Sequence, residues 1–361
     1  MKQWVRASAS FASALLTALG VLCVAARLPA GTGGNAAAAA AGFILPAGNA
    51  DGFFHEDEVD DTEPSRVSEP PSAASGPSAQ SSAAGPSSSA PPAASAAQSA
   101  SPSAAASQAG KVLELSVGNS GTQVGNMWVK NSTERHTSIN FAQELQKAPA
   151  VKIVKNSPSP QVLIYHTHTT ESFDGTARST DLTKSVCAVG DEIARELQAS
   201  GVGVLHDKTY HDYPAYDGSY DRSQATMKKD LAKYPGIQVT LDIHRDAMHR
   251  SDGTMLKTTS VVAGKKAAQL MILAGCDDDG SLGFPNWECN LRLALRLQKE
   301  LSDDYPGLAR PLDFCARRYN EHMTKGSLLI EVGTDANTLE EAKYTGTLLG
   351  KSLARVLNGL A

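Results

Sequence analysis

The distribution of apolar residues divides the chain into three parts. Residues 7–26 form an apolar run without a charged side chain. From about Lys111 onward, short apolar runs alternate with polar segments, as in a packed globular domain. The pattern therefore predicts a signal-anchor helix in residues 1–30, a linker in residues 31–110 and one folded domain in residues 111–361.

Within the domain, the spacing of apolar residues predicts strands and helices in alternation. Short apolar or alternating runs are typical of strands, and apolar residues three to four positions apart are typical of helices. Strands are expected at residues 112–117, 127–131, 161–165, 201–205, 237–243, within 266–274 and at 327–331; helices are expected at 141–145, 191–198, 227–234, 290–301 and after Thr338 as N-cap. This order favours an α/β fold with a mostly parallel sheet flanked by helices.

The N-terminal apolar run has the layout of an export signal. Lys2 and Arg6 precede it, and a 20-residue run is long enough to span a bilayer at about 1.5 Å per residue. Because positive residues stay in the cytoplasm, the rest of the chain should be exported. We favour an uncleaved anchor over a cleaved signal, which predicts a single-pass cell-membrane protein with an extracytoplasmic catalytic domain.

The segment between anchor and domain is predicted to be disordered. Residues 64–109 are nearly all Ser, Ala, Pro, Gly and Gln, so they cannot bury enough apolar surface to offset the entropy cost of ordering. A flexible tract of this length spans on the order of 35–40 Å. It would let a membrane-held domain act on a layer above the membrane.

Charge and cysteine content narrow the function classes. The formal net charge is -5, so nothing indicates a nucleic-acid partner. None of the five cysteines forms a C-x-x-C pair. An oxidising compartment permits disulfides, but the sequence does not choose among the pairings, and most of these cysteines are interpreted as buried residues.

The candidate chemistry follows three predicted strands. His166, His168 and Glu171 come after the strand at 161–165, His244 comes after 237–243, and Glu331 ends the strand at 327–331. Ligands gather beyond the carboxyl ends of parallel strands. Imidazole and carboxylate groups are the ligands of catalytic Zn²⁺, whose bound water loses its proton near neutral pH. The pattern therefore indicates a zinc hydrolase.

These residues also admit a purely structural interpretation and interpretations as other kinds of enzyme. A single histidine at a strand end is more often a hydrogen-bonded core residue, but three such strand ends in one domain are hard to explain by packing. The sequence has no G-x-S-x-G elbow, P-loop or dinucleotide-binding glycine pattern after a strand. Metal-assisted hydrolysis is therefore favoured over nucleophilic or nucleotide chemistry.

Seven ordered segments resemble the stage II sporulation protein P family, which digests peptidoglycan during engulfment of the forespore. They run from about Gln161 to the C-terminus and read VLIYHTHTTESF, HDYPAYDGSYDRS, LDIHRDA, PNWECNLRLALRLQKEL, YPGLARPLDF, RRYNEHMTKGSLLIEVG and NTLEEA. Two positions depart from the family pattern, because Phe284 stands where a histidine is usual and Glu321 where a glutamine is usual.

The resemblance implies a zinc-dependent N-acetylmuramoyl-L-alanine amidase, with some ability to cut peptide cross-links. It implies peptidoglycan as substrate and stage II sporulation proteins D and M as partners. Carried over by position, the zinc ligands are His168, Glu171 and His244, and Glu331 is the catalytic base. Related amidases take their carboxylate ligand from a helix near what is here 181–186, where no glutamate stands, so Glu171 is assigned instead.

Two further residues were assigned to catalysis. Arg245 is expected to stabilise the oxyanion or, equally, to pair with a neighbouring aspartate. His166 is expected to act as a ligand or as a partner of one.

Two rival functions stay open at this point. One is a silent peptidoglycan-binding scaffold that recruits another hydrolase; the other is a metal-dependent deacetylase of the sugar N-acetyl group.

Overall fold

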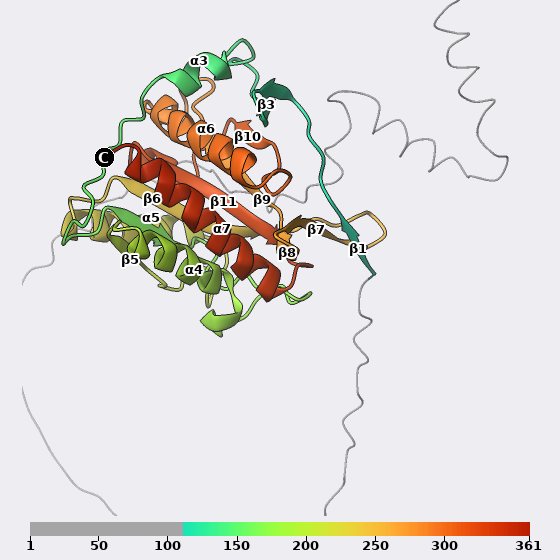
Figure 1. The fold of residues 1–361 in the computed structure, drawn as a ribbon. Helices are drawn as coiled ribbons and strands as arrows, with labels where there is room; N and C mark the ends of the chain where they lie inside the picture. Colours follow the sequence, from blue (N-terminus) through green and yellow to red (C-terminus); the bar gives the residue numbers. More distant parts are fainter. Residues whose placement is uncertain (1–110) are drawn as a thin grey trace, which may run out of the picture.

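The computed structural model describes residues 111–361 (Figure 1). The expected signal-anchor helix in 1–30 and the expected linker in 31–110 lie outside the described residues, so both stay predictions. Among the helices of residues 111–361, none combines the length and the apolar character needed to cross a bilayer.

An eight-stranded sheet forms the centre of the domain, in the order β2-β3-β10-β9-β11-β6-β4-β5. A smaller sheet in the order β1-β7-β8 lies at one end (Figure 1). The strands are β1 (Val112–Leu115), β2 (Thr122–Val124), β3 (Met127–Ser132), β4 (Val162–Tyr165), β5 (Val204–His206), β6 (Val239–Asp246), β7 (Met255–Val262), β8 (Lys265–Ala268), β9 (Leu270–Gly275), β10 (Leu312–Cys315) and β11 (Ser327–Thr334).

The large sheet is mixed, which corrects the expectation of a mostly parallel sheet. Strands β4, β5, β6 and β11 form one parallel group, and β3, β10 and β9 form another. The two groups meet at the antiparallel pair β11–β9, and β2 is antiparallel to β3. The prediction of strand direction was wrong because a run of apolar residues indicates a buried strand but does not show in which direction the neighbouring strand runs.

Helices cover both faces of the sheet. They are α3 (Phe141–Gln146), α4 (Val186–Ala199), α5 (Ser219–Lys233), α6 (Trp287–Asp304) and α7 (Leu339–Asn358), with 3₁₀ turns η1 (Leu182–Lys184) and η2 (Glu321–Met323). In β4, Val162 and Ile164 pack with the main core, which includes apolar residues of α4, α6 and α7. Leu163 and Tyr165 face the other way, against Met227 of α5. Strand β4 is therefore buried on both faces.

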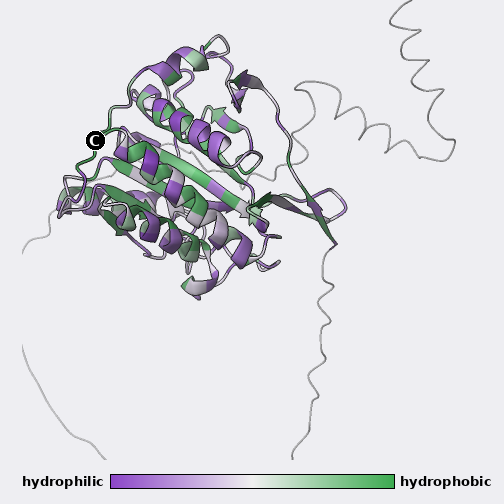
Figure 2. Ribbon diagram, in the orientation of Figure 1, coloured by the Kyte–Doolittle hydropathy of each residue, from purple (hydrophilic) through white to green (hydrophobic). Residues whose placement is uncertain are grey.

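Helix α7 shows how local sequence sets an element. The Thr338 side chain accepts a hydrogen bond from the backbone N–H of Glu341, and the Glu341 carboxylate accepts one from the backbone N–H of Thr338, which forms a complete capping box. Most of the buried residues of the helix are apolar, and Figure 2 shows the helix lying over the apolar strand β11. The predicted helix start at Thr338 is confirmed.

Most predicted elements are present, with shifted ends. The run at 266–274 is divided into β8 and β9, with Gln269 between them. Its side chain exchanges hydrogen bonds with the backbone of Val117 (2.7 Å and 3.2 Å). Strands β2, β7 and β10 were not predicted, because β2 and β10 are three and four residues long and the centre of β7 is a polar run at 257–260.

A buried carboxyl group lies in η2. The Glu321 side chain accepts hydrogen bonds from the backbone N–H groups of Gly275 (2.7 Å) and Leu329 (3.0 Å). Burial raises the pKa of Glu321 to about 8, although those two hydrogen bonds act to lower it. The folded protein therefore favours the neutral acid near pH 7.

This burial predicts a pH-dependent stability. Between the unfolded pKa near 4.5 and the folded pKa near 8, only the folded state holds the proton. The free energy of unfolding should fall as pH rises through this window, by up to about 1.4 kcal/mol per pH unit. Glu321→Gln should make this slope shallower by the share that Glu321 contributes, as measured by urea denaturation of the full chain from pH 5 to 8. The exposed control Glu134→Gln should keep it; equal slopes in wild type and Glu321→Gln would refute the assignment.

Candidate functional site

The carboxyl ends of β4, β6 and β11 lie side by side, because these strands pair in parallel. Glu331 on β11 is in register with His244 on β6, and Tyr165 at the end of β4 is in register with Asp242. The structure thus brings His168, His244 and Glu331 to the same edge of the sheet.

His168 lies in the turn after β4, and its ring is held by aromatic neighbours. It stacks on Tyr216 with ring centroids 4.5 Å apart and 7° between the planes, and its edge meets Tyr220. The Tyr216 hydroxyl lies 3.2 Å from Nε2 of His168, whereas Nδ1 is buried without a hydrogen-bond partner. Burial lowers the pKa of His168, so the ring is neutral, as a metal ligand must be.

His244 lies between two carboxylates. Its Nδ1 lies 3.5 Å from Glu171 Oε2. Its Nε2 lies 2.9 Å from Asp242 Oδ1, but the two atoms are not aligned as a hydrogen bond requires. Burial acts to raise the pKa of Glu171, but His244 outweighs it, and the pKa falls to about 2. Against burial, the same two carboxylates raise the pKa of His244 well above its usual value. The anionic carboxylates of Glu171 and Asp242 therefore both lie beside the His244 imidazole.

Asp242 fixes the turn that carries His168. Its carboxylate accepts the backbone N–H of Thr167 (2.8 Å) and the Thr167 hydroxyl (2.6 Å), in addition to facing His244. One carboxylate thus faces His244 and also holds the backbone that follows β4.

Glu331 has one free acceptor. Its side chain is half-buried, and Oε2 is buried without a hydrogen-bond partner. Burial raises the pKa of Glu331 to about 8, His244 and Arg310 lower it, and the nearby carboxylates of Asp246 and Glu171 raise it further. This carboxyl group is therefore poised to exchange a proton near neutral pH.

Arg245 faces away from this edge group. Its backbone N–H donates to Glu171 Oε2 (3.0 Å), but its guanidinium donates to the backbone carbonyls of Ser172 (2.8 Å), Ala177 (2.6 Å) and Asp246 (3.4 Å). Arg245 therefore secures the loop that carries Glu171, and its side chain pairs with neither Asp242 nor Asp246 through a carboxylate.

His166 also lies apart from the candidate ligands. Its Nδ1 is 2.8 Å from the carbonyl oxygen of Ile243, and its Nε2 is 2.9 Å from Nε2 of His206. Burial, with a smaller effect of His206, lowers the pKa of His166 to about 3. Both ring nitrogens are used, so His166 joins β4 to β5 and β6 and offers no atom to a ligand.

The donor set at the sheet edge suits zinc. His168 Nδ1 and His244 Nε2 are buried without hydrogen-bond partners, and a histidine–carboxylate–histidine set is what catalytic zinc sites use. Within residues 111–361, the His, Cys, Asp or Glu donor atoms that lie within 4.8 Å of one another as a group of three belong to His136, Cys276 and Asp278, and not to His168, Glu171 and His244.

Three contributors to the edge were not singled out from sequence. Tyr216 holds His168, Asp212 accepts from Thr170 in the loop before Glu171, and Arg310 pairs with Asp246 at 2.9 Å. The buried guanidinium of Arg310 has Nε and Nη2 without partners. All three occur in segments that carry the family resemblance, and this resemblance was the sequence feature that could have identified them. No periodicity or residue spacing distinguishes them.

Comparison with known proteins gives a family and several distant structures. The family model described as stage II sporulation protein P matches residues 81–357. Stage II sporulation protein P of Bacillus subtilis (strain 168) is 29% identical over 260 residues, which cover 63% of this chain and 62% of that protein. The match thus spans less than two thirds of the length of that relative.

Two of the similar solved structures are amidases. The N-acetylmuramoyl-L-alanine amidase AmiC2 of Nostoc punctiforme shares 12% identity at a TM-score of 0.33, covering 56% of this chain and 97% of that one. The N-acetylmuramoyl-L-alanine amidase of Clostridium difficile 630 shares 15% identity at a TM-score of 0.31, with coverage of 56% and 97%.

Proposed function

Because the chain belongs to the stage II sporulation protein P family, we propose that it is a peptidoglycan hydrolase of sporulation that cleaves the amide between N-acetylmuramic acid and L-Ala. A secondary activity on peptide cross-links is included in the proposal. The observation that carries it is the meeting of His168, His244 and Glu331 at one sheet edge, with an unpartnered buried atom on each.

We assign zinc to His168, Glu171 and His244. A zinc ion bound there supplies a Lewis acid and lowers the pKa of its water. Tyr216 stacked on His168, and Asp242 facing His244, would keep the two rings in place when the ion is bound. The backbone N–H of Arg245 does the same for Glu171.

Glu331 is the proposed base and acid. In its ionised form it takes a proton from the attacking water at Oε2, which no protein group occupies, and then gives it to the departing amine of L-Ala. The positive charge of Arg310 favours the ionised form, and burial opposes it. Proton transfer at a single carboxyl group thus serves both halves of the reaction.

Location and partners are proposed with the function. The basic residues before the apolar run in 1–30 support a single-pass anchor with the domain outside the membrane. Family membership supports peptidoglycan as substrate and stage II sporulation proteins D and M as partners.

Amine labelling of a peptidoglycan digest tests the bond that is cut. The full chain should create new free amines on L-Ala, because amidase action leaves that nitrogen unsubstituted. New amines on glucosamine or muramic acid alone would indicate a deacetylase, and no new amine with retained binding to sacculi would indicate the silent scaffold. Either result would overturn the proposal.

A further inference from the structure

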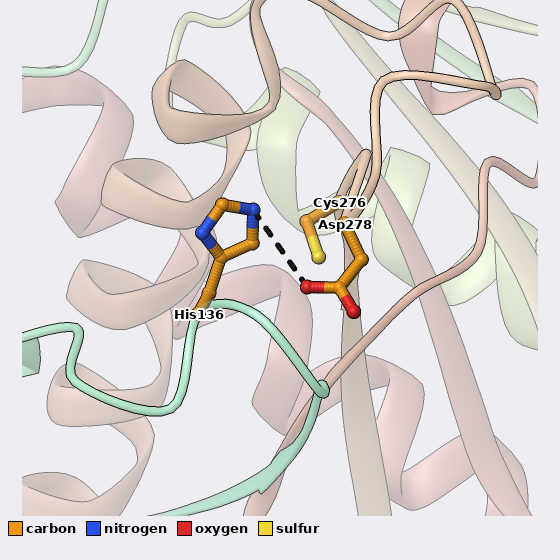
Figure 3. A group of neighbouring side chains, drawn as sticks. All are labelled: His136, Cys276 and Asp278. Carbon is orange, nitrogen blue, oxygen red and sulfur yellow. Dashed lines mark ion pairs between the residues drawn. The ribbon is translucent and has the colours of Figure 1, made fainter.

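A second cluster of ligand-type side chains lies far from the candidate hydrolase edge. Figure 3 shows His136, Cys276 and Asp278 turned toward one another, and one donor atom from each lies within 4.8 Å of the other two. His136 follows β3, whereas Cys276 and Asp278 follow β9. Because β9 runs antiparallel to β11, its carboxyl end lies at the sheet edge opposite to the one that carries Glu331.

We propose that His136, Cys276 and Asp278 form a structural zinc site that fastens the segment after β3 to the end of β9. The proposal does not depend on the proposed hydrolase function, since it uses none of the same residues. Thiolate, imidazole and carboxylate are the side chains that bind zinc in proteins, and a thiol ligand favours zinc over magnesium or calcium.

The distances suit one tetrahedral ion. Ligand atoms about 2.1 Å from zinc lie roughly 3.4 Å apart at the corners of a tetrahedron. His136 Nε2 lies 3.8 Å from Asp278 Oδ1, and the same nitrogen lies 3.3 Å from the carbonyl oxygen of Asp277. His136 and Asp278 are partly exposed while Cys276 is buried, so solvent reaches the site from one side and leaves a fourth position for water.

The surroundings hold the three ligands in place. The His136 ring lies against Trp287, with centroids 4.8 Å apart. The Asp278 carboxylate accepts hydrogen bonds from the backbone N–H groups of Glu134 and Arg135, each at 3.0 Å. It therefore already binds the segment that carries His136. The backbone N–H of Cys276 donates to the carbonyl of Cys315 on β10 (2.9 Å). Because these contacts already hold the three side chains, binding of the ion should need little further ordering of them.

Zinc binding at this site releases one proton. Burial, assisted by the charges of Asp278 and Asp277, raises the pKa of the Cys276 thiol to about 12, so the free protein carries S–H there. On binding, the S–H bond breaks, a sulfur–zinc bond forms and the proton goes to solvent.

Cobalt substitution of the full chain tests the site. We expect a near-ultraviolet sulfur-to-cobalt charge-transfer band, since the hydrolase edge has no cysteine among its assigned ligands. The band should be lost in Cys276→Ser and retained in Cys289→Ser, which changes a partly exposed cysteine, and in His168→Ala. No band in the wild type, or a band that survives Cys276→Ser, would overturn the proposal.

Zinc content and thermal stability provide an independent readout. His136→Ala and Asp278→Asn should each lose about one zinc ion per chain relative to wild type. Their melting temperature should no longer rise on addition of zinc. Hydrolysis of peptidoglycan should persist, because the hydrolase edge is intact. Unchanged zinc content in both variants would refute the site, whereas absence of hydrolysis in the wild type would count against the proposed function alone.

Discussion

Glu331→Gln is expected to lower peptidoglycan turnover about 10²–10⁴-fold. The amide keeps the shape of the side chain but cannot take a proton from water or pass it to the leaving amine. Because Glu331 is not among the assigned ligands, zinc content should stay at the wild-type level. Stem-peptide release from purified sacculi, measured with metal content in the same preparations, gives both quantities.

Glu340→Gln is the matched control for this experiment. Glu340 is an exposed residue in the first turn of α7 and is not among the proposed ligands or the proposed base, so the same change there should leave turnover unaltered. If Glu331→Gln also loses zinc, then Glu331 is a ligand and Glu171 becomes the candidate base. Full activity in Glu331→Gln would contradict the proposed mechanism.

Removing either His168 or His244 should abolish activity and should cause the loss of one metal ion per chain. His168→Ala and His244→Ala each delete a proposed ligand, and losing one of three protein ligands weakens a catalytic zinc site severely. In His244→Ala, the carboxylates of Glu171 and Asp242 also face each other without the imidazole between them, so stability should fall as well. Metal content, turnover and melting temperature should be measured on each variant.

His249→Ala serves as the control for the histidine variants. His249 is partly exposed and pairs with Asp335 at 2.7 Å, outside the proposed ligand set. It should retain zinc and turnover. A variant of His168 or His244 that binds zinc normally and still hydrolyses peptidoglycan would remove that residue from the site.

The sequence predicted the position of the candidate functional site better than it predicted the directions of the strands in the sheet. Apolar runs ending in His168, His244 and Glu331 were enough to place three strand ends together, because parallel neighbours share an edge. The antiparallel pair β11–β9 escaped prediction, since strand direction depends on long-range pairing that no local pattern records.

Side-chain roles were harder to predict than positions. Arg245 directly follows His244, but adjacent residues on a strand point to opposite faces, so its guanidinium reaches backbone carbonyls instead of the edge. His166 and His168 alternate in sequence, yet the chain turns after Tyr165 and separates their rings. Tyr216 comes from a distant loop and acts by stacking, which has no sequence signature.

The central claim is hydrolysis of the muramoyl–L-Ala amide at the sheet edge for which zinc binding is proposed. Mass spectrometry of the products released from intact sacculi by the full chain tests it most directly, with a chelator added and with zinc then restored. We predict free stem peptides that begin with L-Ala and glycan strands with unsubstituted lactyl groups, lost with the chelator and recovered with zinc. Products in which every stem peptide remains joined to muramic acid, or release that the chelator does not affect, would contradict the account.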